Sequence, residues 1–262
     1  MVWLTFFGSA VLIVLAATQL AKYGDAIAIR TKLGGMFVGT LLMAGATSLP
    51  ELLTTISSLD QGVPNLAAGN LMGSNMVNML MLAVLDLLYR QARILRRVAM
   101  RHALTASLAA LLIGMTAFFI LADVELRIGW VGLDSLLLIV AYVVGLRLIQ
   151  SGNLATDIEP AADEELEGVP GLGHSLIGFG LAAVALVFIT PWLVRSSTDI
   201  AELTGLGAGF VGTTLVALVT SLPELVTTIA AVRIGAYDLA VGNLFGSNTF
   251  NIVALGITDF FY

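Results

Sequence analysis

The nine residues Thr47-Ser-Leu-Pro-Glu-Leu-Leu-Thr-Thr55 recur in the second half of the chain as Thr220-Ser-Leu-Pro-Glu-Leu-Val-Thr-Thr228, with eight of nine positions identical. A second motif, Gly69-Asn-Leu-Met-Gly-Ser-Asn75, recurs as Gly242-Asn-Leu-Phe-Gly-Ser-Asn248. Both pairs share an offset of 173 residues (220 − 47 and 242 − 69). One offset across two segments and their connection indicates an internal duplication rather than a chance likeness of apolar segments.

The composition places these motifs in a membrane protein. Of the 262 residues, 58% are hydrophobic and 11% are charged, whereas a soluble domain usually carries about 25% charged residues. Apolar runs near the length of about 20 residues that crosses a bilayer lie around 2–21, 35–58, 66–88, 102–122, 129–149, 172–194, 207–232 and 238–259. The sequence therefore predicts an all-α polytopic membrane protein.

The positions of the two copies predict their directions through the membrane. The first copy occupies the second and third spans and the second copy occupies the seventh and eighth, so an odd number of crossings separates them. An odd number inverts one copy relative to the other, as in inverted-topology repeat transporters, which bind their substrates near the middle of the membrane. The first copy continues into two further helices that have no counterpart after Tyr262. We therefore expect eight helices of a ten-helix fold, and a truncated second repeat.

This duplication suggests three units. A first inverted repeat of five membrane helices is expected over 1–150, an acidic linker over 151–171, and a second repeat of three helices over 172–262. The linker contains six of the acidic residues, and it lacks the residue spacing of a calcium-binding loop. We interpret it as a solvated connection, although a regulatory cation-binding loop is an alternative.

Basic residues predict the orientation. Lys22, Arg30 and Lys32 follow the first span, and five arginines lie within 90–101, after the third span. Lys and Arg gather in cytoplasmic loops, and these two loops lie on the same side of the membrane. The N-terminus is thus expected outside and the acidic linker in the cytoplasm, with the protein in the cell (plasma) membrane.

The glutamates of the first motif, Glu51 and Glu224, predict a cation site. A carboxylate at the centre of a membrane helix costs about 2.5–3.5 kcal/mol on insertion scales, so such residues mark ion pathways. Glu51 shares a helical face with Thr47 and Ser48. Pro50 has no N–H and disturbs the preceding turn of the helix. Backbone carbonyls beside the carboxylate therefore lose their usual hydrogen-bond donors. Carboxylate, hydroxyl and carbonyl oxygens suit hard cations such as Na+ and Ca2+.

The second motif adds a polar stripe to the next helix. In each copy, three polar side chains recur every four residues along one face: Asn70, Ser74 and Asn78, and Asn243, Ser247 and Asn251. The glycines of the motif are also four residues apart, a spacing typical of closely packed membrane helices. Close packing would bring the polar stripe to the glutamate-bearing helix.

Together the two motifs resemble the α-repeats of the sodium/calcium exchanger branch of the calcium/cation antiporter superfamily. This resemblance implies a secondary active antiporter that exchanges Ca2+ for Na+ by alternating access, with the ions as substrates and no cofactor. It implies that Glu51 and Glu224 ligate Ca2+ together with the carbonyls of Thr47 and Thr220. It implies further ligands for Na+ and for the middle of the site: Ser48, Ser74, Ser221, Ser247, the carbonyls of Ala44 and Ala217, and Asn78 and Asn251.

Departures from the family pattern leave alternatives open. Ala46 and Val219 stand where the family carries glycine, and Asn251 stands where relatives often carry Asp. An H+- or K+-coupled divalent cation exchanger is one alternative, and a cation channel is an alternative of a different class. An enzyme is disfavoured, because His102 and His174 lie near span ends and neither has a matching copy. The expected partners are Ca2+, Na+ and the lipid bilayer, without nucleic acid, and the oligomeric state is left open.

Overall fold

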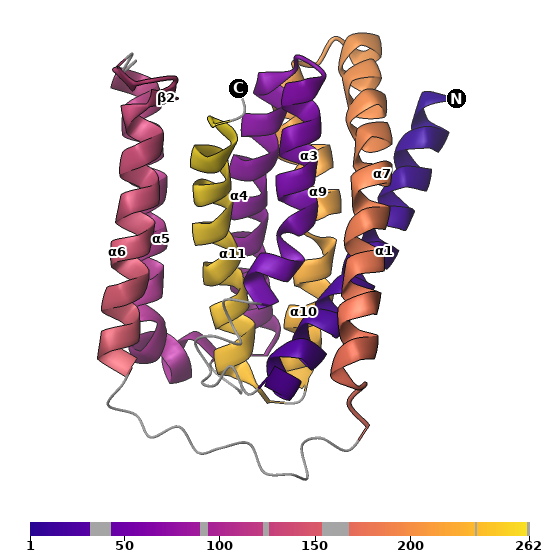
Figure 1. Cartoon of the computed structure of the whole chain (residues 1–262). Coiled ribbons are helices and arrows are strands. Elements are labelled where there is room, and N and C mark those ends of the chain that lie inside the picture. The colour runs from indigo at the N-terminus through magenta and orange to yellow at the C-terminus, as the bar shows by residue number, and fades with distance from the viewer. Residues whose placement is uncertain (32–42, 90–93, 123–125, 154–167, 234, 261–262) are drawn as a thin grey trace.

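The computed structural model describes residues 1–31, 43–89, 94–122, 126–153, 168–233 and 235–260 (Figure 1). Helices account for nearly all of them: α1 (Val2–Thr31), α3 (Leu49–Asp60), α4 (Pro64–Leu88), α5 (Ile94–Ala122), α6 (Leu133–Asn153), α7 (Leu172–Thr204), α8 (Ala208–Val211), the π-helical turn η2 (Gly212–Val216), α9 (Ala217–Thr220), α10 (Leu222–Arg233) and α11 (Tyr237–Thr258). Residues 43–47 form a further helical segment before α3. The all-α membrane fold expected from the composition is confirmed.

Four of the described helices are long and apolar enough to cross a membrane by themselves, and a bent pair adds a fifth. They comprise α4, α7, Val2–Gly24 of α1 and His102–Ala122 of α5, with the pair Ala208–Thr220 and Leu222–Arg233. The helices α6 and α11 coincide with expected spans but do not meet this criterion within the described residues. For α11 the reason is its three asparagines, which lower the mean hydropathy. The expected span 35–58 lies partly outside the described residues.

The two repeat copies run in opposite directions (Figure 1). From its start, α3 extends toward the end of the molecule at which the N-terminus lies, and α4 returns from there. Its counterpart α10 extends toward the opposite end, where α7 begins, and α11 returns. This arrangement confirms the inverted-topology repeat.

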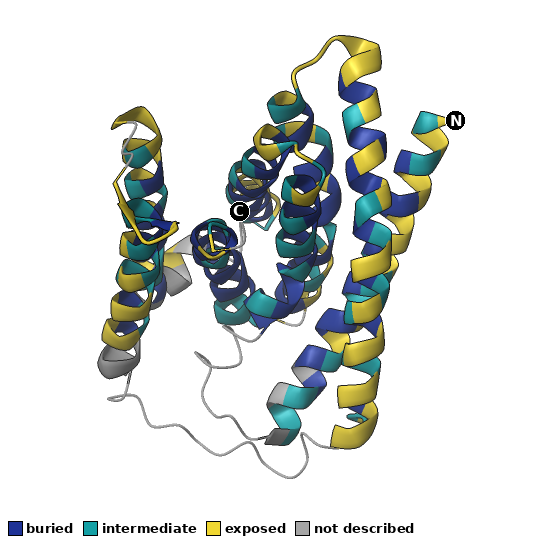
Figure 2. Cartoon of the chain, turned by 45° about the horizontal axis from the view of Figure 1, so that its top comes forward, coloured by how far each residue is buried: buried dark blue, intermediate teal, exposed yellow. Residues whose placement is uncertain are grey.

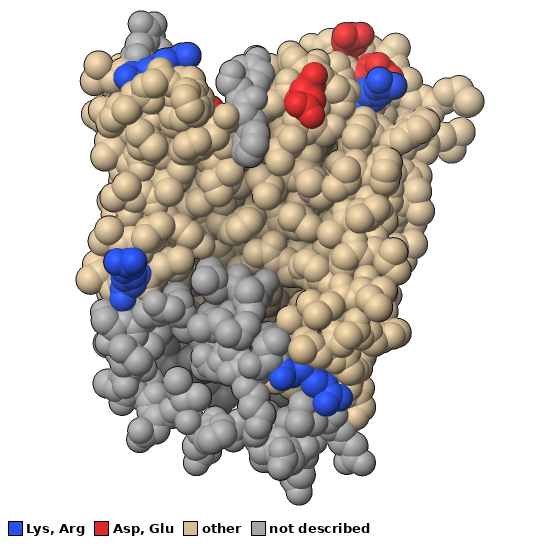
Figure 3. All heavy atoms as spheres, in the orientation of Figure 1, with Lys and Arg blue, Asp and Glu red and all other residues tan. Residues whose placement is uncertain are grey.

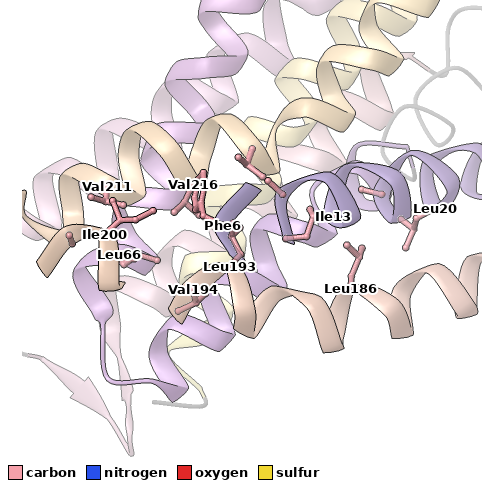
Figure 4. Packing of buried hydrophobic residues seen from close by; sticks show 14 of the residues in the cluster. Phe6, Ile13, Leu20, Leu66, Leu186, Leu193, Val194, Ile200, Val211 and Val216 are labelled. Atoms are coloured by element: carbon pink, nitrogen blue, oxygen red, sulfur yellow. The ribbon is translucent and has the colours of Figure 1, made fainter. Parts of the chain in front are cut away.

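The long helices α1 and α7 form an antiparallel pair along one side of the repeats (Figures 1 and 4). Buried apolar side chains recur every seven residues on both: Phe6, Ile13 and Leu20 on α1, and Leu186, Leu193 and Ile200 on α7. A seven-residue repeat keeps one seam of a helix against its partner. Val211 and Val216 join the same cluster, so the pair is packed directly against the broken helix of the second copy.

Glycines bring the central helices into backbone contact. A Cβ atom on Gly69 would lie 2.4 Å from the Gly209 carbonyl oxygen, and one on Gly73 would lie 2.3 Å from the Thr213 carbonyl oxygen. Only a residue without a Cβ fits at such distances. The close packing expected from the glycine spacing is present in this copy, and its partner is α8 and η2, the part of the broken helix of the other copy that precedes α10.

The helical pair α5 and α6 stands at the other side of the molecule and packs on α11. The expected span 129–149 starts too early, because a short hairpin of β1 (Arg127–Ile128) and β2 (Val131–Gly132) precedes α6. Gly129 adopts φ +70° at its turn, a conformation that glycine accepts without strain. The Gly132 N–H donates to Asp259 Oδ2 at 2.7 Å, which ties the hairpin to the end of α11.

The distributions of buried and of charged residues are those expected of a membrane protein. Buried residues concentrate in the central helices, whereas the outer faces of α5, α6 and α7 are exposed (Figure 2). In Figure 3, charged side chains of the described residues lie near the two ends of the visible face, with an uncharged band between them. Polar groups in the central helices therefore have to satisfy one another rather than water.

Candidate cation-binding site

The site begins at a break in each glutamate-bearing helix. Ser48 and Ser221 both have φ −86° and ψ 3°, outside the regular helical region. Each is followed after one residue by a proline, Pro50 or Pro223, which cannot donate a helical hydrogen bond. In the second copy, the helical segments Ala208–Thr220 and Leu222–Arg233 meet at the break at an angle of 43°. The repeated sequence thus produces the same local backbone twice.

Both carboxylates lie in the first turn after their break. Glu51 is in the first turn of α3 and Glu224 in the first turn of α10. The N-terminus of a helix carries a partial positive charge that favours a nearby carboxylate. Glu51 is 1% exposed and Glu224 is 0% exposed, so both are sealed inside the protein.

The two copies exchange hydrogen bonds across their interface. The Ser221 hydroxyl donates to Glu51 Oε1 at 3.1 Å, and the Ser48 hydroxyl donates to Glu224 Oε1 at 3.1 Å. Each serine therefore serves the glutamate of the other copy. The two glutamates consequently lie at one shared interface, in the arrangement that the inverted repeat predicts.

The polar stripes of α4 and α11 complete the surroundings of these carboxylates. Ser74 donates to Glu51 Oε1 and Ser247 to Glu224 Oε1, both at 3.4 Å. One helical turn further along each stripe lie Asn78, 0% exposed, and Asn251, 1% exposed. All of the predicted serine and asparagine ligands are therefore buried at the breaks or along these two stripes, and we call them together with the glutamates the polar cluster.

The threonines lie on the other side of each break. The Thr47 hydroxyl donates to the Ala44 carbonyl at 3.2 Å, and the Thr220 hydroxyl donates to the Ala217 carbonyl at 3.4 Å. The Ala44 and Ala217 carbonyls also accept the N–H groups of the break serines, at 2.9 and 3.0 Å. In this conformation, two of the four predicted carbonyl ligands, those of Ala44 and Ala217, are thus occupied by hydrogen bonds.

Four buried oxygens of the cluster have no hydrogen-bond donor within the described part of the chain. They form two pairs related by the repeat: Glu51 Oε2 with Glu224 Oε2, and Asn78 Oδ1 with Asn251 Oδ1. A buried oxygen without a donor is costly, and a group of them that includes two carboxylates suits a hard cation. Among the described residues, no cluster of three or more His, Cys, Asp or Glu side chains gathers, so the site counts two carboxylates.

Two further asparagine pairs belong to this cluster, although the predicted ligand set omits them. Asn70 Oδ1 accepts the Thr220 hydroxyl at 3.1 Å, and Asn243 Oδ1 is 3.4 Å from the Thr47 hydroxyl. Asn75 and Asn248 pair with the asparagines of the opposite stripe. The sequence signal for these asparagines is that they recur in both copies of the second motif. The motif does not show which residues of the other copy they contact.

The sequence of the chain is similar to known proteins along most of its length. Residues 1–149 and 174–261 match the family described as sodium/calcium exchanger protein. The inner membrane protein YrbG of Escherichia coli (strain K12) is 31% identical, over 83% of this chain and 66% of YrbG. The sodium/calcium exchanger MaX1 of Methanosarcina acetivorans is 30% identical, over 96% of this chain and 81% of MaX1.

A solved structure shares the fold. The crystal structure of an H+/Ca2+ exchanger, CAX, matches with a TM-score of 0.72 over 97% of this chain and 66% of that protein. The sequence identity is 15%, so this likeness establishes the fold alone. The chain spans about two thirds of the length of both YrbG and CAX.

Proposed function

Because the chain belongs to the sodium/calcium exchanger protein family, we propose that it is a secondary active antiporter that exchanges Ca2+ for Na+ across the membrane. The observation that carries the proposal is the set of four buried oxygens on Glu51, Glu224, Asn78 and Asn251 that lack a donor among the residues that the structure describes. Two carboxylates offer Ca2+ a matching opposite charge, and the two amide oxygens add neutral ligands. The serines Ser48, Ser74, Ser221 and Ser247 supply hydroxyl oxygens for Na+.

The burial of the site supports alternating access rather than an open channel. Glu51 and Glu224 are 1% and 0% exposed, and serines from opposite copies hydrogen-bond to their carboxylates. An ion reaches these carboxylates only after the helices rearrange. A channel, by contrast, needs a continuous path that is open while ions pass.

Two candidate functions differ in the ion that is exchanged for Ca2+. MaX1, whose name specifies Na+ and Ca2+, is 30% identical to this chain, which supports Na+. CAX, described as an H+/Ca2+ exchanger, shares the fold, and buried carboxylates serve proton relays as well as cation sites. We therefore keep H+ coupling as the second candidate, with K+ coupling as a variant. The family consists of transporters, and we assign no enzymatic role.

Tracer Ca2+ uptake into membrane vesicles tests the proposal. Vesicles receive an outward gradient of Na+, of K+ or of H+, one at a time, with choline as the balancing cation. We expect only the Na+ gradient to drive uptake. Uptake driven by the pH gradient alone would establish the second candidate, and uptake without any counter-ion would establish a channel.

We further propose that the N-terminus lies outside the cell and that the 151–171 segment is cytoplasmic, between the repeats 1–150 and 172–262. The basic residues after the first and third spans support this orientation. The chain has no cysteine, so single cysteines at Thr5 and Ser151 report the sides cleanly. A membrane-impermeant thiol reagent should label Thr5→Cys in intact cells and Ser151→Cys only after permeabilisation. The opposite pattern would reverse the orientation.

A further inference from the structure

Four asparagines form two crossed amide pairs between α4 and α11. Asn78 Nδ2 donates to Asn248 Oδ1 at 3.0 Å, and Asn251 Nδ2 donates to Asn75 Oδ1 at 3.1 Å. The repeat offset of 173 residues relates the two pairs, since Asn75 corresponds to Asn248 and Asn78 to Asn251. All four side chains are at most 4% exposed. The pairs are therefore a buried, two-fold feature of the interface between the copies.

The pairing fixes which end of each amide is free. Asn78 Oδ1 and Asn251 Oδ1 have no hydrogen-bond partner within the described residues, and neither do Asn75 Nδ2 and Asn248 Nδ2. A carboxamide has an acceptor end and a donor end, and only the acceptor end attracts a cation. Asn78 and Asn251 thus offer oxygens, whereas the free ends of the other two asparagines would repel a cation.

We propose that Asn75 and Asn248 are positioning residues for the transported cation. Asn75 Oδ1 holds the amide nitrogen of Asn251, and Asn248 Oδ1 holds that of Asn78. Each therefore leaves the amide oxygen of its partner without a donor among the described residues and available to a cation. Without this hold, Asn78 or Asn251 can rotate its NH2 group toward the carboxylates and replace a ligand oxygen by a donor. This inference rests on the proposed function, because it assumes that the site binds a cation.

The position of the pairs supports this role. Asn78 and Asn251 lie one helical turn from Ser74 and Ser247, whose hydroxyls donate to the two glutamates. Rotation of either amide would therefore occur one helical turn from the serines that contact the carboxylates. Partners that orient metal ligands typically affect metal affinity about 10- to 100-fold. A merely structural contact between α4 and α11 would instead affect folding and leave the affinity unchanged.

The test measures Ca2+ affinity by isothermal titration calorimetry on the purified full chain, together with thermal unfolding. We expect Asn75→Leu and Asn248→Leu to weaken Ca2+ binding by about tenfold each. The matched control is Leu82→Ala, a buried change on α4 in the cluster that contains Leu244 of α11. It should lower the unfolding temperature and leave the Ca2+ affinity unchanged.

A conservative variant separates positioning from packing. Asn75→Asp keeps the acceptor oxygen that holds Asn251, so it should bind Ca2+ more tightly than Asn75→Leu. If the residue only packs, the apolar leucine should be tolerated better than a buried carboxylate, so Asn75→Leu should unfold at a higher temperature than Asn75→Asp and the two variants should bind Ca2+ equally. This comparison decides the question even if Asn75→Leu fails to fold, because Asn75→Asp should then still bind Ca2+ within about threefold of the wild-type chain, and a tenfold loss would overturn the proposal.

A double-mutant cycle tests the specific pairing. Asn75→Leu should add nothing in an Asn251→Leu background, because Asn75 acts through Asn251, and it should add its full effect in an Asn78→Leu background. Equal effects in both backgrounds would overturn the proposal. Unchanged Ca2+ affinity in both single leucine variants would overturn the positioning role while the exchanger stands, whereas a wild-type chain that binds no Ca2+ would overturn both.

Discussion

The two copies of the repeat agree at their centre and differ toward their ends. At the centre, Ser48 and Ser221 have the same backbone torsions, and each donates to the glutamate of the other copy at 3.1 Å. Two turns beyond Glu51, α3 carries Ser57 and Ser58, whereas the corresponding residues of α10 are Ala230 and Ala231. The duplication has thus preserved the centre, whereas the ends of α3 and α10 beyond it, which we call the two approaches, have diverged.

This difference indicates which part of the sequence the ion constrains. The break and its carboxylate are present in both copies, as expected if the proposed ion is bound between the copies. The two approaches point toward opposite ends of the molecule (Figure 1), so their sequences can differ. The side chains agree with this division: Gln61 at the end of α3 donates to Ser57 at 3.0 Å, whereas Ala231 and Val232 of α10 are buried in an apolar cluster.

The largest effect on Ca2+ uptake is expected when the glutamates at the centre of the two copies are replaced. Glu51→Gln and Glu224→Gln should each reduce Na+-driven Ca2+ uptake by at least about 100-fold, and by similar factors. Removing one partner of a buried charged set costs about 3–5 kcal/mol, and about 1.4 kcal/mol corresponds to a factor of ten. Vesicle uptake measures the loss, and Glu202→Gln, on the exposed face of α7, is the matched control. A large loss in only one glutamate variant would break the equivalence of the copies.

A smaller effect is expected at the break serines. Ser48→Ala and Ser221→Ala each remove a hydroxyl that donates to a buried carboxylate and that is a proposed Na+ ligand. Hydrogen bonds to charged groups contribute about 1.5–3 kcal/mol, so each variant should raise the Na+ concentration for half-maximal exchange about tenfold. Ser197→Ala serves as control, because Ser197 is equally buried and donates only within α7. Indistinguishable Na+ dependence in the control and both variants would remove the serines from the site.

The smallest effect is expected in the approaches. Ser57→Ala and Ser58→Ala should change the half-maximal Ca2+ concentration about twofold to threefold on the α3 side only, since a neutral hydrogen bond contributes about 0.5–1.5 kcal/mol. Ala230→Ser and Ala231→Ser should act on the α10 side only. Uptake assayed separately in right-side-out and inside-out vesicles separates the sides. Equal changes on both sides would show that these residues belong to the shared centre.

The sequence predicted the centre well because the information is local and is present twice. The Thr-Ser-Leu-Pro-Glu motif contains the break, the carboxylate and the hydroxyls, and its 173-residue offset fixes the inverted arrangement. The structure places all of Glu51, Glu224, Ser48 and Ser221 at one interface, as the duplication indicates. Their roles as ion ligands remain predictions for the measurements above.

Element ends and cross-copy contacts were less accessible to sequence reasoning. Hydropathy gave 2–21 and 172–194 for helices that extend to Thr31 and Thr204, because an apolar window ends at the membrane surface while a helix continues beyond it. The π-helical turn at Gly212–Val216 has no signal in the hydropathy pattern. The amide pairs of Asn75 and Asn248 depend on partners 176 and 170 residues away, which only the folded interface brings together.

Direct Ca2+ binding tests the central claim most directly. Isothermal titration of the purified chain should show one Ca2+ per molecule, displaced by Na+, since the two carboxylates match one divalent charge. Glu51→Gln and Glu224→Gln, each verified as folded by circular dichroism, should show no binding at the same concentrations. Full Ca2+ binding by either folded glutamine variant would contradict the account, because the ion would then lie elsewhere than between the two copies of the repeat.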